Sequence, residues 1–222
     1  MLLSCSQFYR WDGIFWGTCP HFLRQRTQKS DGSIGFEGKH LSSYLYQAGK
    51  KVEAIAEQLK KVYPALDAVN VKKLPNGLKQ LEVVENKIKT ESQHLSDSML
   101  RLIAILAQLQ SDRNVVAFDE IENGINTEAV AFLMRTLIEA KQQVIVETHS
   151  PLLLNFLDND LAGESIQYFY KTAEGYTQCK KFFSIPSVAQ RTKVLGAGDI
   201  FLDTELYRLN EKLNSLIVAR AM

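Results

Sequence analysis

Residues 115–120 read VVAFDE, a short continuous apolar run that ends in two carboxylates, Asp119 and Glu120. A second apolar run, VIV, occupies residues 144–146, and residues 127–140 between the two runs have helical spacing. Short apolar strands that alternate with helices are typical of a parallel sheet covered on both faces. Open α/β sheets bind ligands at the carboxyl edge of their strands. The sequence therefore predicts an α/β fold, with a mainly parallel sheet flanked by helices and with Asp119 and Glu120 at its ligand-binding edge.

The rest of the chain supplies further helices and two hairpins. Apolar periodicity predicts helices over residues 41–63, 97–110, 151–157 and 203–219. Turn residues predict two hairpins, one that pairs residues 68–74 with 78–85 and one that pairs residues 166–170 with 176–183. Residues 86–94 are predicted to form a polar loop. Residues 1–38 have no clear period and are left unassigned.

Composition excludes several classes of protein. The chain has 222 residues, 45% of them apolar, which is enough for a core and too much for a disordered tail. A net charge of +1 argues against binding through general attraction to phosphate backbones, although a local basic patch stays open. No apolar run is long enough to span a bilayer, so no membrane partner is expected. The three cysteines, Cys5, Cys19 and Cys179, favour a reducing, cytoplasmic location over a disulfide framework.

The paired carboxylates are the strongest chemical signal. In nucleotide hydrolysis one carboxylate of such a pair holds Mg²⁺, often through water, and the next polarises the attacking water. Asp119 and Glu120 fit these two roles in that order. The alternative is a strand that meets solvent at an acidic turn.

A second signal, VETHSP at residues 146–151, follows the next apolar strand. From there His149 can hydrogen-bond a phosphate oxygen or the attacking water. The alternative places Ser150 at a helix N-cap, Pro151 at the first helical position and His149 in a turn. The capping role is compatible with both interpretations.

A third signal, HLSDSMLR, occupies residues 94–101. Ser96 is a good N-cap, and the free N–H groups of a helix start form an anion site. The alternative is that Ser96 only caps the helix and that no anion binds there. The charge of Asp97 opposes a bound phosphate unless its side chain points away.

The order and spacing of these three segments resemble the signature motif, Walker B motif and switch histidine of ABC-class ATPases. Residues 95–99, LSDSM, stand where that class has LSGGQ, and residues 121–126, IENGIN, look like its D-loop. More closely, residues 38–222 resemble the predicted AAA-type ATPases of the SMC-like and OLD-like group. Those proteins read LSDGxLR, DEPENGLHP and THSP, and their last motif, LG-DLYLDGEL, matches residues 195–206 here.

The resemblance implies ATP and Mg²⁺ as cofactors and gives each site residue a role. Asp119 would bind the metal, and Glu120 and His149 would be catalytic. The nucleotide contacts would be Ser96, Asp97, Ser98 and Asn126. Three positions depart from the group's pattern, because Ser98 replaces a glycine, Ile121 a proline, and Asn126 a histidine or aspartate.

The class also needs a Walker A loop, GxxxxGK[ST]. The nearest approximation, SIGFEGKH at residues 33–40, lacks the first glycine, ends in His40 where Mg²⁺ needs a hydroxyl, and follows no apolar strand. We therefore expect a P-loop NTPase-like lobe whose N-terminal half is incomplete. Its expected parts are a helical-hairpin insertion at 41–94, a Walker B core at 95–160, and C-terminal strands and a helix at 165–220, all within a lobe spanning 39–222.

Three functions stay open. The first is an ATP-hydrolysing lobe of a truncated or split AAA family ATPase. It would act only with its missing N-lobe or with a Walker A-bearing partner, as a homodimer or a heterodimer with an intact homologue, and would be inactive alone. The second is a non-catalytic dimerising or regulatory module. The third is a metal-dependent nuclease using Asp158 and Asp160, although a solvated helix end explains these residues better. Association with DNA is left open.

Overall fold

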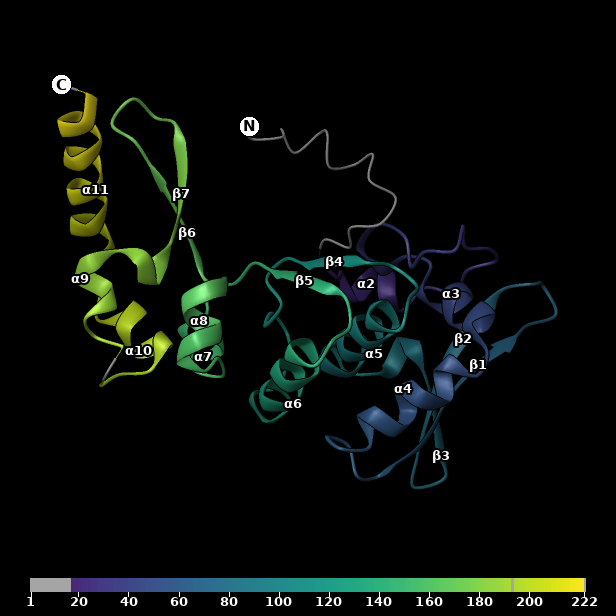
Figure 1. Cartoon of the computed structure of the whole chain (residues 1–222). Helices are drawn as coiled ribbons and strands as arrows, with labels where there is room; N and C mark the ends of the chain where they lie inside the picture. The colour runs from purple at the N-terminus through teal and green to yellow at the C-terminus, as the bar shows by residue number, and fades with distance from the viewer. Residues whose placement is uncertain (1–16, 193, 222) are drawn as a thin grey trace. The chain divides into compact units, whose positions relative to one another are not determined.

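The computed structural model describes residues 17–192 and 194–221, and the chain divides into two compact units, residues 1–148 and 149–222 (Figure 1). The helices of the first unit are α2 (Pro20–Leu23), α3 (Leu41–Ala48), α4 (Lys51–Leu59), α5 (Asp97–Leu109) and α6 (Thr127–Ile138). Its strands are β1 (Leu66–Lys73), β2 (Lys79–Glu85), β3 (Ile88–Glu91), β4 (Val115–Phe118) and β5 (Gln143–Val146). Residues 36–38 and 92–94 form short 3₁₀ turns.

The second unit contains five helices and one hairpin among its described residues. Its helices are α7 (Pro151–Leu154), α8 (Asn159–Ser165), α9 (Pro186–Ala189), α10 (Ala197–Leu202) and α11 (Leu206–Ala221). Its strands are β6 (Gln167–Lys171) and β7 (Thr177–Lys181), and residues 182–184 form a 3₁₀ turn.

The parallel pair β4–β5 positions the candidate site. It runs in register from Val115 opposite Gln143 to Phe118 opposite Val146, and α6 provides the crossover that a parallel pair requires. Figure 1 shows α5 and α6 on one side of this pair. The predicted α/β class is therefore confirmed. Parallel pairing among the described strands is confined to β4–β5, since the short hairpins elsewhere allow only antiparallel strands.

Helix α5 is the centre of the first unit's core. It has apolar residues around most of its circumference, which is typical of a buried helix. The fully buried side chains include Leu100, Leu102, Ile103 and Leu106, each 0–1% exposed. Strand β4 is equally buried, but Ile145 at the centre of β5 is 48% exposed. One side of the parallel pair is thus open at β5.

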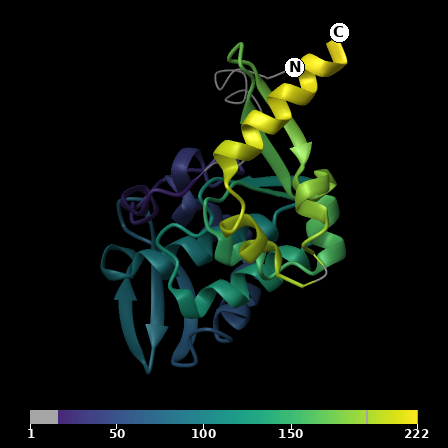
Figure 2. The ribbon, with the colours of Figure 1, turned by 90° about the vertical axis from the view of Figure 1, so that its left-hand side faces the viewer.

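The antiparallel sheet β1–β2–β3 lies in the first unit (Figure 2). The predicted hairpin over β1 and β2 is confirmed, with Gly77 in the left-handed region at φ 82°. The predicted loop 86–94 is wrong in part, because residues 88–91 form β3. The tight turn before β3 uses Asn86 and Lys87, both at positive φ, instead of the Asn-Gly pair that would have signalled it.

The helix predicted over residues 41–63 is two helices. Gly49, with a φ of 56°, separates α3 from α4. The apolar spacing continues across the break, so periodicity alone could not reveal it.

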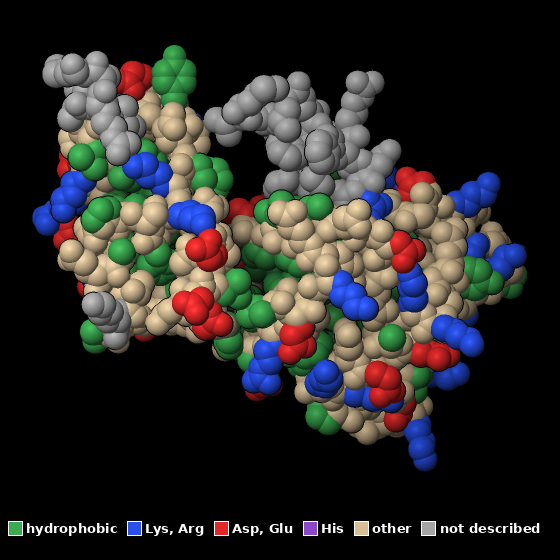
Figure 3. Space-filling model, in the orientation of Figure 1, with side chains coloured by type: hydrophobic (Ala, Val, Ile, Leu, Met, Phe, Trp, Pro, Cys, Tyr) green, Lys and Arg blue, Asp and Glu red, His purple; other side chains and the backbone are tan. Residues whose placement is uncertain are grey.

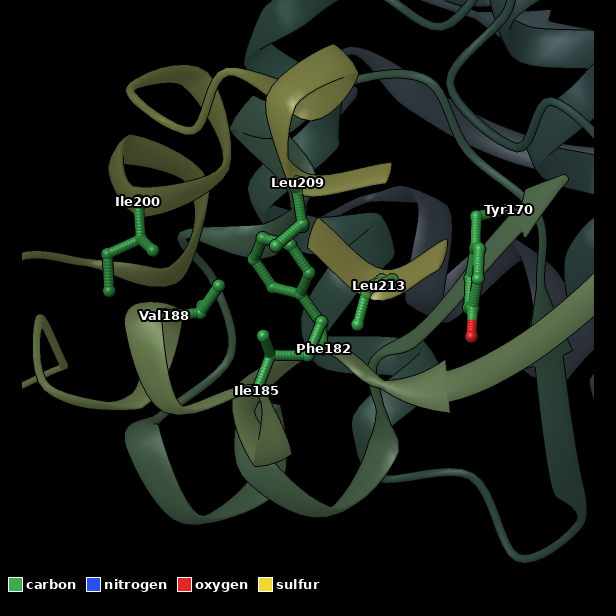
Figure 4. Close-up of a cluster of buried hydrophobic side chains, with 7 residues drawn as sticks. All are labelled: Tyr170, Phe182, Ile185, Val188, Ile200, Leu209 and Leu213. Atoms are coloured by element: carbon green, nitrogen blue, oxygen red, sulfur yellow. The ribbon is translucent and has the colours of Figure 1, made fainter. Parts of the chain in front are cut away.

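The second unit has its own apolar core (Figure 4). It comprises Tyr170, Phe182, Ile185, Val188, Ile200, Leu209 and Leu213. Helix α11 is fixed to the hairpin by the Tyr168 hydroxyl, which donates to Asn210 Oδ1 at 2.9 Å. The predicted hairpin is confirmed, and the predicted closing helix begins at Leu206 rather than Asp203.

Candidate functional site

Residues 119–126, which we call the acidic turn, follow β4 directly. Asp119 and Glu120 are both exposed at the carboxyl end of the strand, as predicted. The backbone N–H of Asn123 donates to the Glu120 carbonyl at 2.9 Å, and that of Ile125 donates to the Glu122 carbonyl at 3.0 Å. These bonds keep the segment compact, so that α6 begins at once after Asn126.

Glu120 has an unusual backbone conformation. Its φ is 45°, in the left-handed region that residues with a Cβ adopt at a cost. The Asn123 side-chain amide donates to Glu120 Oε2 at 3.1 Å, which fixes the direction of the carboxylate. Strained backbone of this kind clusters at functional sites, so the feature marks Glu120 for attention.

The residues that follow β5 hold the acidic turn from one side. The Glu147 carboxylate accepts the backbone N–H of Glu120 at 3.3 Å, and the Glu147 N–H donates to the Phe118 carbonyl at 2.8 Å. The Thr148 hydroxyl donates to Glu122 Oε2 at 2.8 Å. The ends of the two parallel strands are therefore joined through both side chains and backbone.

The start of α5 presents the predicted capping geometry. Ser96 is the N-cap, and its exposed hydroxyl accepts the N–H of Met99 at 3.2 Å. Asp97 is ion-paired with Arg24, whose Nη2 also donates to the Leu95 carbonyl at 2.9 Å. The Arg24 charge compensates that of Asp97, which lessens the electrostatic objection to an anion at this helix start.

Ser98 has a role inside the protein. It is 2% exposed, and its hydroxyl accepts the backbone N–H of Asn126 at 3.1 Å and bonds the Tyr63 hydroxyl at 3.2 Å. The side chain thus connects α5 to the end of the acidic turn. Asn126 itself is exposed at the N-cap of α6.

Arg101 forms a second connection between α5 and the acidic turn. Its Nε is buried without a hydrogen-bond partner among the described residues, and a Cβ on Gly124 would lie 3.1 Å from that atom. Desolvation lowers the pKa of Arg101, while the charges of Asp97 and Glu120 act to raise it. Arg101 therefore places a cation close to both Asp97 and Glu120.

The first unit brings together six of the seven predicted site residues, with the start of α5 beside the acidic turn. His149 is the first residue of the second unit and is exposed three residues after β5 ends. Ser150 and Pro151 take the predicted N-cap and first positions of α7, although Ser150 makes no side-chain capping bond to the helix. Asp158 accepts the Leu161 N–H at 2.7 Å and so caps α8. Capping accounts for this residue without a nuclease site.

The donor set at Asp119 suits Mg²⁺ bound mainly by other groups. Within the described residues, no three His, Cys, Asp or Glu side chains lie close enough together to hold a metal ion. Mg²⁺ is commonly held by one or two carboxylates together with water and substrate phosphates. The exposed Asp119 carboxylate fits this pattern.

Residues 33–40 do not form a phosphate loop. The segment follows a bend rather than a strand, and a 3₁₀ turn spans Phe36–Gly38. A Cβ on Gly38 would lie 2.3 Å from Leu23 Cδ2, and the φ of Gly38 is 84°, so a glycine suits this position, where the segment packs against α2. The rejection of this segment as a Walker A loop is in agreement with the structure.

No helix among the described residues has both the length and the apolar character needed to cross a membrane. Lys and Arg side chains are interspersed with Asp and Glu on the face of the first unit seen in Figure 3. This mixture is consistent with the near-neutral net charge.

The fold is similar to that of an Smc head domain. The structure of "the SmcHead bound to the C-winged helix domain of ScpA" shares 15% identity with the chain at a TM-score of 0.54, over 76% of this chain and 55% of that one. A structure from work on "ATP-driven dimerization and DNA stimulated activation of SMC ATPases" shares 15% identity (TM-score 0.49), over 69% of this chain and 98% of that one. The Smc head from Pyrococcus yayanosii shares 15% identity (TM-score 0.48), over 65% of this chain and 29% of that one.

Residues 23–155 match the family model described as "AAA domain, putative AbiEii toxin, Type IV TA system". Because this match covers more than half of the chain, the protein belongs to this AAA-domain family. The predicted membership of an AAA-type ATPase family is thereby confirmed. No curated protein is significantly similar to the chain in sequence.

Sequence reasoning missed several residues that shape the site. Arg101 stands four residues after Asp97 on a helix, which was a usable signal for a charge pair on one face. Glu147 and Thr148 immediately precede His149, but nothing in their spacing indicates that they turn back toward β4. Arg24 lies in the segment left unassigned, and its pairing with Asp97 has no sequence signal.

Proposed function

We propose that the chain is the ATP-hydrolysing C-terminal lobe of an ABC-class ATPase. The observation that carries this proposal is the direct connection of the α5 start to the acidic turn, through the Ser98–Asn126 hydrogen bond and through Arg101 against Gly124. A helix start can bind a phosphate, and a carboxylate next to it can activate water. The two groups form one unit here.

Glu120 is the general base in this proposal. Its exposed carboxylate, oriented by Asn123, accepts the proton of the water that attacks the γ-phosphate. Asp119 would hold Mg²⁺, which would supply positive charge to the phosphates of bound ATP. His149 lies beyond β5 in the sequence and would hydrogen-bond the γ-phosphate or the water.

Ser96 and Asp97 act on a nucleotide held by a partner chain. Both residues are exposed, and the Arg24 pairing compensates the charge of Asp97. The SMC ATPases of one similar structure undergo "ATP-driven dimerization". We propose the same behaviour for this chain, as a homodimer or with an intact homologue. Buried Ser98 would contribute by holding the acidic turn rather than by touching the nucleotide.

The phosphate-gripping loop is proposed to come from a missing N-lobe or from the partner. Two observations support this. Residues 33–40, the nearest approximation to a Walker A loop, are packed against α2, and Ile145 on β5 is 48% exposed where parallel strands are normally covered. The purified chain alone should therefore show no ATPase activity.

The test compares phosphate release by the chain alone, by a Walker A-bearing family member alone, and by their mixture, with Mg²⁺ and ATP. Extra turnover in the mixture that Glu120→Gln removes supports the proposal, since losing a positioned base costs about 10²- to 10⁴-fold in rate. A complex that forms without extra turnover would favour the non-catalytic module instead.

A further inference from the structure

Something must stabilise the left-handed backbone of Glu120. A residue with a Cβ at φ 45° is disfavoured relative to a right-handed conformation. Such a conformation persists only where its surroundings over-determine it. Asn123 contacts the Glu120 side chain and so orients the carboxylate, but it leaves the amide of Glu120 to another partner.

Glu147 supplies that partner. Its carboxylate accepts the Glu120 N–H at 3.3 Å, while its own backbone N–H is bonded to the Phe118 carbonyl. The Glu147 carbonyl in turn accepts the N–H of Ile121 at 3.4 Å. Glu147, the first residue after β5, therefore contacts the chain two residues before Glu120, at Glu120 itself and one residue after it.

Thr148 extends the same contact. Its hydroxyl donates to Glu122 Oε2 at 2.8 Å, two residues beyond Glu120. The Glu147 carboxylate adds a further negative charge beside Asp119, Glu120 and Glu122, which is electrostatically unfavourable because like charges repel. Its hydrogen bond with the Glu120 amide compensates for this cost.

We propose that Glu147 and Thr148 are positioning residues, a β5 clasp that holds Glu120 in its left-handed conformation and so aims its carboxylate. The consequence for hydrolysis rests on the proposed function. The conformational claim concerns the isolated chain alone. In an active assembly the loss of the clasp lowers kcat and leaves KM unchanged, because the base is misdirected while nucleotide contacts stay in place.

The first experiment measures hydrogen exchange at the Glu120 amide in the purified chain, together with the Glu120 Cα and Cβ chemical shifts. Glu147→Ala should speed exchange at this amide about fivefold, the effect of losing one ordinary hydrogen bond. Glu147→Gln keeps an oxygen acceptor and should retain protection. Thr148→Val removes the hydroxyl that bonds Glu122 and Thr148→Ser keeps it, so these two variants form the matched pair for that hydrogen bond. The amide of Ala104, inside α5, is the control for general loosening.

Unchanged Glu120 exchange and shifts in Glu147→Ala, with a folded α5, would overturn the proposal. Equal loss of Ala104 protection would also overturn it, because the role would then be general stability.

The second experiment measures turnover in the assembly with the Walker A-bearing family member. We expect kcat to fall on the order of 10²-fold in Glu147→Ala, with rescue by Glu147→Gln. A fall in kcat with no rescue, or a rise in KM instead, contradicts positioning. A wild-type assembly without turnover refutes the proposed function, while the exchange data still decide the clasp.

Discussion

Replacing Glu120 by glycine and by alanine tests the strained backbone of the acidic turn directly. Both changes remove the carboxylate and its hydrogen bond to Asn123. The difference between the two variants in free energy of unfolding therefore reports the cost of the backbone conformation at position 120. At φ 45° alanine keeps the left-handed penalty of about 1–2 kcal/mol. Glycine does not have that penalty, but its greater conformational entropy in the unfolded state lowers the free energy of unfolding by about 0.5–1 kcal/mol. Glu120→Gly should therefore be more stable than Glu120→Ala by up to about 1.5 kcal/mol.

The control is Glu53, an exposed residue on α4, where the order should reverse. In a helix, glycine is less stable than alanine by about 1 kcal/mol. The free energy of unfolding of the first unit is best measured from hydrogen exchange of the core α5 amides at Leu102 and Leu106, which open with the whole unit. If alanine at position 120 proves more stable than glycine by about 0.5–1 kcal/mol, as at an ordinary right-handed position, the left-handed conformation of Glu120 is refuted. Glu147 and Thr148 would then have no left-handed conformation to hold.

Three other substitutions test the site. Ser98→Ala should destabilise the first unit by about 0.5–1.5 kcal/mol, because the part-buried hydrogen bond from the Asn126 N–H to the Ser98 hydroxyl is lost; urea unfolding measures this, and an unchanged midpoint contradicts it. Gly124→Ala should cost about 1–2 kcal/mol for its φ of 68°, and more if Arg101 cannot move away; a neutral result would mean that the turn is adaptable. Ser96→Arg should block ATP-dependent association on size-exclusion chromatography, although losing an exposed cap costs only about 0.5–2 kcal/mol, and normal complex formation would count against a signature role.

Periodicity and strand endings predicted most of the fold that surrounds the site. The runs at 115–118 and 144–146 became β4 and β5, since apolar runs of four and three residues bounded by polar ones are shorter than a typical helix and are rich in β-branched residues. The errors fall where one residue's backbone overrides the pattern. Gly49 breaks a continuous apolar spacing, and Asn86 with Lys87 makes a turn that lacks the usual glycine.

The sequence predicted where the acidic residues of the candidate site lie, but not the contacts that fix their positions. Asp119 and Glu120 follow a strand, so their place at its carboxyl end is set by local sequence. The contacts of Glu147 with Glu120, and of Arg24 with Asp97, join residues 27 and 73 positions apart. Such contacts depend on the three-dimensional register of β4 against β5 and on where α2 packs, neither of which leaves a mark on residue spacing.

The departures from the group's motif are explained together by the geometry of the first unit. A serine in place of the signature glycine would crowd a partner's γ-phosphate if its side chain faced outward, but Ser98 is buried and accepts the N–H of Asn126, itself a departure. Ile121, where the group has proline, is 4% exposed, and its N–H donates to the Glu147 carbonyl, a bond that proline could not make. The substitutions at Ser98 and Ile121 therefore each add a contact inside the first unit. A sequence losing its fold by drift would instead leave buried donors unpaired at these positions, so the pattern favours an acidic turn that is maintained for use.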